Sequence, residues 1–348
     1  MIDQIEIQNF RCFRRLDIPF CRRINILVGD NGSGKTAILE AIYLALANSP
    51  AAAVSVRQFR GFDGVFTGNA KQLEDALWGD LFHNFDLDNP VFVRLGGSGP
   101  EARQVSISRT PSPDMLLFAA SLPSPNTAAS VTFTWTDSAG KEHSIRPRIT
   151  QAGVGIDPSE ETIPDFFMFS SNHPPGSSET AGRLSELSKA RRLKEFVEII
   201  KKEYEWIEDL SIEVRAGSPT IYASLKGTEA LVPLASISGA INRVIAIYLA
   251  AAVRKDGVVI VDELENGVFY EHHSAVWRSL LHISRTQNTQ LFISSHSMEC
   301  LKALREATGE NVADIAFWRL ERKEGVPVLM QFSGDDLMAA LQSDTEIR

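Results

Sequence analysis

Residues Gly29-Asp30-Asn31-Gly32-Ser33-Gly34-Lys35-Thr36 decide the fold, because they match the phosphate-binding pattern G-x-x-x-x-G-K-[ST]. The apolar run 24–28 (INILV) predicts a strand before this loop, and residues 36–47 carry apolar side chains at helical spacing. A strand that enters the loop and a helix that leaves it are the context in which the pattern binds a nucleotide. The glycines let backbone N–H groups approach a phosphate, and the helix N-terminus adds partial positive charge.

The loop assigns a role to individual residues. We expect the Lys35 ammonium to bridge the β- and γ-phosphates, which also makes it a candidate catalytic residue, and the Thr36 hydroxyl to bind Mg²⁺. The expected cofactors are therefore ATP and Mg²⁺. The candidate nucleotide-binding residues in the loop are Asn31, Gly32, Ser33, Gly34, Lys35 and Thr36.

An acidic pair follows a second apolar strand late in the chain. Residues 258–261 (VVIV) end in Asp262 and Glu263, which places both carboxylates at the carboxyl edge of a parallel strand. We expect Asp262 to hold Mg²⁺ through water, and Glu263 to orient and deprotonate the attacking water. After another apolar strand comes His296, which we expect to bond the γ-phosphate and to report its loss.

Composition excludes several classes of protein. The 348 residues are 44% hydrophobic and 23% charged, which is ordinary for a globular protein, and the net charge of −9 argues against coating nucleic acid by bulk charge. Cys12, Cys21 and Cys300 form neither a zinc spacing nor a disulfide framework, which fits a reducing compartment. The longest apolar run, 244–253, falls short of the about 20 residues of a membrane span. Because the N-terminal stretch is charged rather than apolar, we expect a cytoplasmic protein without a membrane partner.

Apolar periodicity divides the chain into four expected segments. Alternating short runs between Gly-, Pro- and Ser-rich connectors indicate antiparallel strands, with 111–125 as a surface loop. Residues 184–210 predict one helix, followed by a hairpin around Gly217-Ser218-Pro219. The segments are the first part of a nucleotide-binding head (1–60), a β-rich antiparallel insertion (61–165), a helical arm with the hairpin (166–230) and the second part of the head (231–348), where regular α/β alternation indicates a largely parallel sheet.

Two stretches carry a family resemblance. The first is I-x-x-F-R-x-F (Ile7, Phe10, Arg11, Phe13) followed by the phosphate loop, and the second is DELENG (262–267) with Trp277, SSHSMEC (294–300) and the closing Glu346-Ile347-Arg348. Together they resemble the ABC-type ATPase heads of the RecF and OLD branch, over roughly residues 1–48 and 230–348. The resemblance implies an α/β P-loop NTPase head with a mixed or parallel core sheet, an antiparallel β-subdomain and a helical arm.

The resemblance also implies a dimer. ABC-type heads carry an LSGGQ-like segment that caps the γ-phosphate of the other subunit, and residues 234–243 correspond to it in a degenerate form. Ile237 stands where the serine would be, and Ser238 and Gly239 stand where two glycines would be. Backbone N–H groups at this helix N-terminus can still bind phosphate. The alternative is a plain N-capped core helix. The implied assembly is a homodimer with ATP sandwiched between the heads, or a higher oligomer.

Three functions stay open at this point. By resemblance, stand-alone heads of this kind occur in bacterial anti-phage systems, where they regulate or scaffold a separate nuclease or toxin. The alternatives are a RecF-like DNA-repair ATPase and an ATP-dependent scaffold without hydrolysis. Residues 183–202 hold seven basic and three acidic residues, so one helix here would present a basic face to DNA. A solvated face with i,i+4 ion pairs is the alternative.

Some features remain open or are excluded by length. Gln58 is a candidate Q-loop residue, and Arg11 or Phe13 could flank the adenine. No long coiled coil fits between the phosphate loop and residue 234. About 50 residues follow His296, and from them we expect no Toprim nuclease domain.

Overall fold

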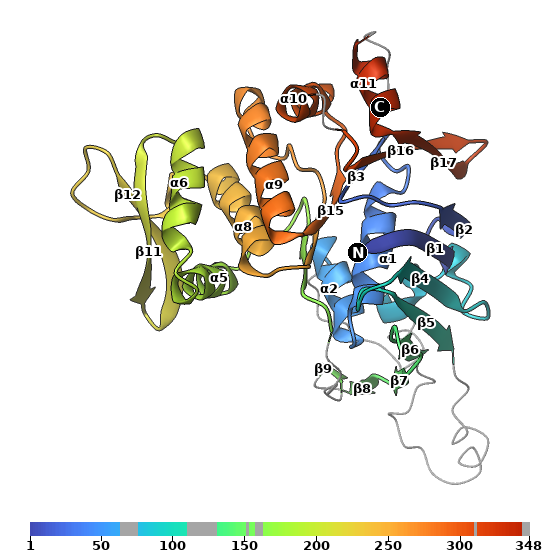
Figure 1. Ribbon diagram of the computed structural model, residues 1–348. Coiled ribbons are helices and arrows are strands. Elements are labelled where there is room, and N and C mark those ends of the chain that lie inside the picture. The colour runs from blue at the N-terminus through green and yellow to red at the C-terminus, as the bar shows by residue number, and fades with distance from the viewer. Residues whose placement is uncertain (63–75, 110–130, 151–152, 157–162, 310–311, 343–348) are drawn as a thin grey trace. The chain divides into compact units, whose positions relative to one another are not determined.

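The computed structural model describes residues 1–62, 76–109, 131–150, 153–156, 163–309 and 312–342 (Figure 1). The chain folds into two compact units, each built from several segments. Unit 1 comprises Met1–Cys21, Gly32–Pro164 and Leu320–Leu329, and unit 2 comprises Arg22–Asn31, Asp165–Arg319 and Met330–Arg348. The expected surface loop 111–125 and the closing Glu346-Ile347-Arg348 lie outside the described residues.

Unit 1 contains a six-stranded antiparallel sheet. Burial alternates regularly along β5 (Arg103–Arg109) and β6 (Val131–Thr136). In β6, Val131, Phe133 and Trp135 are buried while the threonines between them face the other side. The expected insertion 61–165 shares this sheet with the first two strands of the chain. In spatial order the strands are β2 (Phe13–Ile18), β1 (Ile2–Phe10), β4 (Val91–Gly97), β5 (Arg103–Arg109), β6 (Val131–Thr136) and β7 (Glu142–Ile145).

The helix that follows the phosphate loop covers the apolar face of this sheet. Helix α1 (Lys35–Leu46) contacts β1, β4 and β5, and the Trp135 indole N–H donates to the carbonyl of Leu44 at 3.0 Å. Burying this indole costs little because its one donor is paired. The remaining elements of unit 1 are α2 (Ala51–Phe59), the short helices η1 (Gly79–Leu81) and η2 (His83–Phe85), and the two-stranded sheet of β8 (Arg148–Thr150) and β9 (Gly153–Gly155).

Unit 2 is organised around the parallel sheet that the sequence predicts. The strand order is β10 (Phe166–Phe169), β14 (Val258–Val261), β15 (Gln290–Ser294), β3 (Ile24–Gly29), β16 (Ile315–Lys323) and β17 (Val326–Ser333), with residues 320–329 of the last two strands assigned to unit 1. The first four strands pair in parallel. Every residue of β3, β14 and β15 is buried, because helices leave these strands no solvated face.

Helices and a hairpin form layers beside this sheet. In Figure 1, α5 and α6 lie between the hairpin β11–β12 and the helices α8 and α9. Among the described residues, no helix combines the length and the apolarity that membrane crossing requires. The elements are α5 (Ser177–Lys189), α6 (Leu193–Glu203), β11 (Ile207–Arg215), β12 (Ser218–Leu225), β13 (Val232–Pro233), α7 (Leu234–Ile237), α8 (Gly239–Val253), η3 (Tyr270–His272), α9 (His273–Gln287), α10 (Met298–Thr308) and α11 (Gly334–Gln342).

The prediction of one helix over 184–210 is wrong. Helix α5 ends in a Schellman motif: Arg191 has φ +59°, its N–H donates to the Ser188 carbonyl, and the Arg192 N–H donates to the Leu187 carbonyl. Glycine usually occupies this left-handed position. Because arginine stands there instead, the sequence pattern does not indicate that the helix ends. Arg183 is also buried, with its guanidinium 4.1 Å from the centre of the Phe167 ring. Residues 183–202 therefore do not form a single basic face.

The turn of the predicted hairpin is displaced. Ala216 and Gly217 both have positive φ, at +49° and +80°, as a two-residue type I′ turn requires. Ser218 and Pro219 instead pair with Arg215 and Val214 in the β11–β12 ladder. Proline normally indicates a turn, but it is tolerated here because it lies near the strand end.

Candidate nucleotide-binding site

The candidate residues lie in both units. Gly32, Ser33, Gly34, Lys35 and Thr36 belong to unit 1, together with the β1–β2 turn against which Gly34 packs. The members in unit 2 are Asn31, Ser238, Gly239, Asp262, Glu263 and His296.

The glycines of the phosphate loop adopt conformations that other residues avoid. Gly32 has φ +75° and Gly34 has φ +114°. A Cβ on Gly34 would lie 2.6 Å from Phe13 Cζ and 3.0 Å from Cys12 Sγ. Gly34 is also the N-cap of α1, and its carbonyl accepts the Ile38 N–H at 3.1 Å. The loop therefore needs glycine at position 34 for its backbone angle and for its close approach to the β1–β2 turn.

Two charged residues of the loop region have defined surroundings. Lys35, the first residue of α1, is 7% exposed. Arg322, on β16, donates from Nε to the Gly32 carbonyl at 3.0 Å. Sequence analysis missed Arg322 because 290 residues separate it from Gly32 and no local pattern indicates the contact.

Arg11 and Phe13, the residues expected near an adenine, are engaged inside unit 1. The Arg11 guanidinium lies 2.7 Å from the fully buried Glu40 carboxylate on α1 and 3.3 Å from Asp80. Burial lowers the pKa of Arg11, and these carboxylates oppose that shift. Phe13 is 2% exposed. Both side chains thus hold the β1–β2 turn against α1, and neither presents a free surface for stacking.

Gln58 lies on α2 rather than in a loop. It is exposed, while the neighbouring Arg57 and Arg60 bind inward to Asp80 and Glu40 at 2.7 and 2.6 Å. The Arg60 pair fixes the end of α2 to α1 and the Arg57 pair fixes α2 to η1, which leaves Gln58 at the surface of a packed helix.

The turn after β14 carries Asp262 and Glu263, and Ser294 holds both. The Ser294 hydroxyl donates to Asp262 Oδ1 at 2.6 Å and accepts the Glu263 N–H at 2.8 Å. Glu263 has φ +53°, a conformation that costs free energy unless its surroundings impose it. The sequence analysis gave Ser294 no role. A serine at the end of an apolar strand, after the acidic pair, was nevertheless a signal that could have indicated a hydrogen bond to that pair.

Arg243 fixes the same turn from α8. Its guanidinium donates to the carbonyls of Ser170, Asp262 and Glu263, the last two at 2.6 and 3.3 Å. Arg243 is 7% exposed, and burial lowers its pKa while the nearby carboxylates oppose the shift. It connects the end of β10, the start of α8 and the acidic turn, so the conformation of Glu263 depends on three elements.

His296 lies beside two carboxylates. Its Nδ1 is 3.2 Å from Glu265 Oε1 and 4.0 Å from Glu263 Oε1. The Glu263 side chain is 34% exposed and the His296 side chain 46%, so both can reach solvent. Two of the three candidate catalytic residues, Glu263 and His296, are therefore neighbours within unit 2.

Ser238 and Gly239 begin helix α8. Ser238 is its N-cap, and its hydroxyl accepts the Ile241 N–H at 3.4 Å. A Cβ on Gly239 would meet nothing within 4 Å. The helix N-terminus is exposed, as binding of a phosphate requires. It also has a side-chain cap, as an ordinary helix start does, so the geometry is compatible with both roles.

The residues expected to hold Mg²⁺ supply hard oxygen donors. Among the described residues, no group of three or more His, Cys, Asp or Glu side chains could hold a metal ion. Mg²⁺ bound with a nucleotide needs only one or two protein oxygens in addition to phosphates and water. The 4% exposed Asp262 carboxylate and the Thr36 hydroxyl are of the right chemical type for this role.

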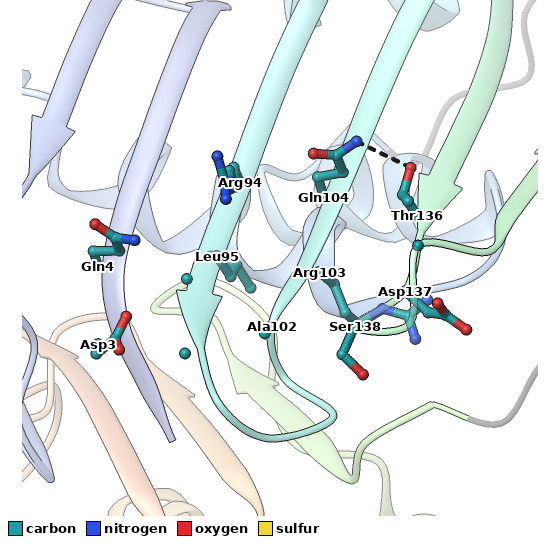
Figure 2. Close-up of a pocket in the computed structure, with 13 residues that line it drawn as sticks. Asp3, Gln4, Arg94, Leu95, Ala102, Arg103, Gln104, Thr136, Asp137 and Ser138 are labelled. Atoms are coloured by element: carbon teal, nitrogen blue, oxygen red, sulfur yellow. Dashed lines mark hydrogen bonds between the residues drawn. The ribbon is translucent and has the colours of Figure 1, made fainter.

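A separate concave surface lies on the polar face of the unit 1 sheet. Figure 2 shows Gln4, Arg94, Gln104 and Thr136 on neighbouring strands, lining a pocket of about 440 Å³. Gln104 donates to the Thr136 hydroxyl at 3.0 Å. Gly96 makes room for Gln4, since a Cβ there would lie 2.3 Å from Gln4 Cγ. Sequence analysis singled out none of the residues that line this pocket.

Comparison with known proteins places this geometry in a class. The structure is similar to the crystal structure of an SMC head bound to the C-winged helix domain of ScpA, with a TM-score of 0.53. The match covers 97% of this chain and 99% of that one, and the two sequences are 13% identical. This likeness shows the fold alone. The fold is that of an ABC-type P-loop ATPase head.

Parts of the chain are similar in sequence to known proteins. Residues 4–76 match the model of an AAA domain. The DNA replication and repair protein RecF of Lactobacillus acidophilus is 43% identical over 76 residues, which are 22% of this chain and 20% of RecF. The DNA double-strand break repair Rad50 ATPase of Methanopyrus kandleri is 36% identical over 99 residues, 28% of this chain and 10% of Rad50. The chain is thus homologous to RecF and Rad50 over part of its length, and it covers a fifth or less of these relatives.

Replacing Gly34 tests how tightly the loop packs. We expect Gly34→Ala to lower the free energy of unfolding by about 2–4 kcal/mol, because backbone strain adds to the collision with Phe13. Gly32→Ala is the matched control, since a Cβ there meets nothing within 4 Å and only strain of about 1–2 kcal/mol remains. Urea unfolding of the nucleotide-free proteins measures both. Equal losses would contradict the close contact of Gly34 with the β1–β2 turn.

Proposed function

We propose that this protein binds Mg²⁺-ATP and hydrolyses it, as an ABC-type ATPase head. The observation that carries the proposal is the acidic turn after β14, where Ser294 and Arg243 hold Glu263 in a strained conformation near His296. Strain of this kind persists when the surroundings impose it, and it occurs most often at functional sites.

Each candidate residue has a role in this proposal. The Lys35 ammonium and the backbone N–H groups of 31–34 bind the phosphates, and the Thr36 hydroxyl and the Asp262 carboxylate hold Mg²⁺. When bound, Mg²⁺ neutralises phosphate charge. Glu263 takes a proton from water at its carboxylate, and its 34% exposure lets water reach it. His296 donates a hydrogen bond to the γ-phosphate.

The proposed assembly is a homodimer that closes around ATP. The exposed N-terminus of α8 supports it, because Ser238 and Gly239 can offer backbone N–H groups to the γ-phosphate bound by a second copy. A 15-residue helix also directs its partial positive charge to this end. Closure in the ATP state and opening after hydrolysis would give the protein two assembly states, and higher oligomers would use the same contact.

The role that we propose for these two states is control of a separate nuclease or toxin in bacterial anti-phage defence. It rests on the resemblance carried by residues 262–267 and 294–300. A second candidate, a DNA-repair ATPase, is favoured by the RecF and Rad50 matches. ATP turnover measured with and without duplex DNA separates them. Faster ATP turnover in the presence of DNA would support the repair role, whereas a turnover rate that DNA does not change would oppose it.

Removing the proposed general base should separate binding from hydrolysis. We expect Glu263→Gln to retain ATP affinity and to slow hydrolysis by roughly 10²-fold or more, because the amide cannot accept the proton. Glu271→Gln, an exposed carboxylate on η3, is the control and should keep normal turnover. Steady-state ATPase assays and labelled-ATP titrations provide both quantities. Unchanged turnover in Glu263→Gln would show that another residue is the general base.

Mixed dimers test the contact made by α8. We expect Gly239→Arg to fold, because open space surrounds a Cβ there, and to lose turnover by blocking closure of the dimer with bulk. Mixing it with Lys35→Ala should restore part of the activity, since one of the two sites in a mixed dimer then has an intact loop and an intact α8 N-terminus.

Gly182→Arg, at an equally open glycine of α5, is the control for the substitution itself and should remain active. If Gly239→Arg alone is fully active, the α8 N-terminus is an ordinary capped helix and the two-site dimer is wrong.

A further inference from the structure

Glu265 makes two contacts to His296 with one carboxylate oxygen. The backbone N–H of His296 donates to Glu265 Oε1 at 2.8 Å, and the ring Nδ1 lies 3.2 Å from the same oxygen. The Glu265 side chain is 10% exposed, whereas that of His296 is 46% exposed. An anchored carboxylate therefore holds an accessible imidazole by both its backbone and its ring.

This arrangement fixes the ring chemically as well as spatially. A carboxylate beside Nδ1 favours the proton on that nitrogen, which leaves Nε2 as the nitrogen for the γ-phosphate. In the ATP-bound state we expect Nε2 to take a second proton from solvent, so that the ring donates from Nδ1 to Glu265 and from Nε2 to the phosphate. Glu265 rather than Glu263 is the carboxylate bonded to Nδ1, because Glu263 Oε1 is farther from that nitrogen, at 4.0 Å. His296 is thereby drawn toward Glu265 rather than toward the proposed general base.

The surroundings of Glu265 keep it in place. Its second oxygen, Oε2, is buried and has no hydrogen-bond partner in the part of the chain that the structure describes. His273, the first residue of α9, is 5% exposed, and the Glu265 charge acts on its ring. The carboxylate is thus largely buried and is bonded to the loop that bears His296, which limits its movement.

We propose that Glu265 is the positioning residue of His296: it orients the ring, sets its tautomer and keeps it apart from Glu263. The proposal rests on the proposed ATPase function insofar as His296 acts on the γ-phosphate. Glu265 itself contacts neither nucleotide nor water in this role. Its loss should therefore slow turnover through His296 and leave ATP binding almost unchanged.

The first test is spectroscopic and does not depend on activity. Ring ¹⁵N chemical shifts of labelled histidine report which nitrogen carries the proton, and His296→Ala assigns the signal of His296. At pH 8 we expect the Nδ1-protonated form in the nucleotide-free protein and a mixture of tautomers in Glu265→Ala. Glu265→Gln keeps the shape and an accepting oxygen, so it should retain much of the Nδ1-protonated form. An unchanged tautomer in Glu265→Ala would overturn the proposal.

The second test is a double-mutant cycle on ATP turnover. We expect Glu265→Ala to lower kcat about tenfold and to change KM by less than about twofold, with partial rescue by Glu265→Gln. In a His296→Ala background the same substitution should have no further effect, because its route of action is gone. Glu299→Gln, an exposed carboxylate on the first turn of α10, removes the same charge nearby and should leave turnover unchanged.

The outcomes distinguish the two proposals. Additive losses in the cycle would show that Glu265 acts independently of His296 and would overturn the inference while leaving the ATPase intact. A wild-type protein that neither binds nor hydrolyses ATP would instead overturn the proposed function, and the tautomer of His296 would still decide whether Glu265 positions the ring.

Discussion

The Ser294 hydroxyl bridges Asp262 and Glu263, the two residues of unit 2 to which we assign Mg²⁺ binding and water activation. It accepts a hydrogen bond from the backbone of Glu263 and donates one to the carboxylate of Asp262. Both bonds arise because β14 and β15 are adjacent parallel strands, so their carboxyl ends meet at one edge of the sheet. Arg243 completes the restraint by binding the carbonyls of the same turn. A buried guanidinium needs several acceptors, and the turn provides them.

The phosphate loop depends on a different constraint, which is close packing. Gly34 has no Cβ, and this lets Phe13 and Cys12 approach the start of α1. The ion pairs of Arg11 and Arg60 with the buried Glu40 then hold the β1–β2 turn and α2 against that helix. Breaking one partner of such a network is costly, because a buried charge remains uncompensated. The loop therefore starts from a rigid base in unit 1, and the acidic turn from a rigid base in unit 2.

Local pattern was enough to predict much of this fold. The fully apolar strands β3, β14 and β15, and the motifs that follow them, indicated a parallel sheet with its functional residues at the strand ends. The break at Arg191 was missed because a left-handed arginine replaces the expected glycine. The contacts of Ser294, Arg243 and Arg322 were missed for another reason: their partners lie far away in the sequence, and only the folded topology joins them. The same holds for β1, whose pairing with β4 no local periodicity encodes.

Binding of Mg²⁺-ATP to the wild type and to Lys35→Ala, measured by equilibrium titration, tests the central claim most directly. Replacing Lys35 removes the positive charge that we expect to bind phosphate, and it alters no glycine of the loop. The account predicts saturable binding by the wild type and at least about tenfold weaker binding by the variant, a loss of about 1.4 kcal/mol. Unfolding curves should show that both proteins are folded. Equal affinities, or no binding by the wild type, would contradict the assignment of residues 29–36 as the nucleotide-binding loop.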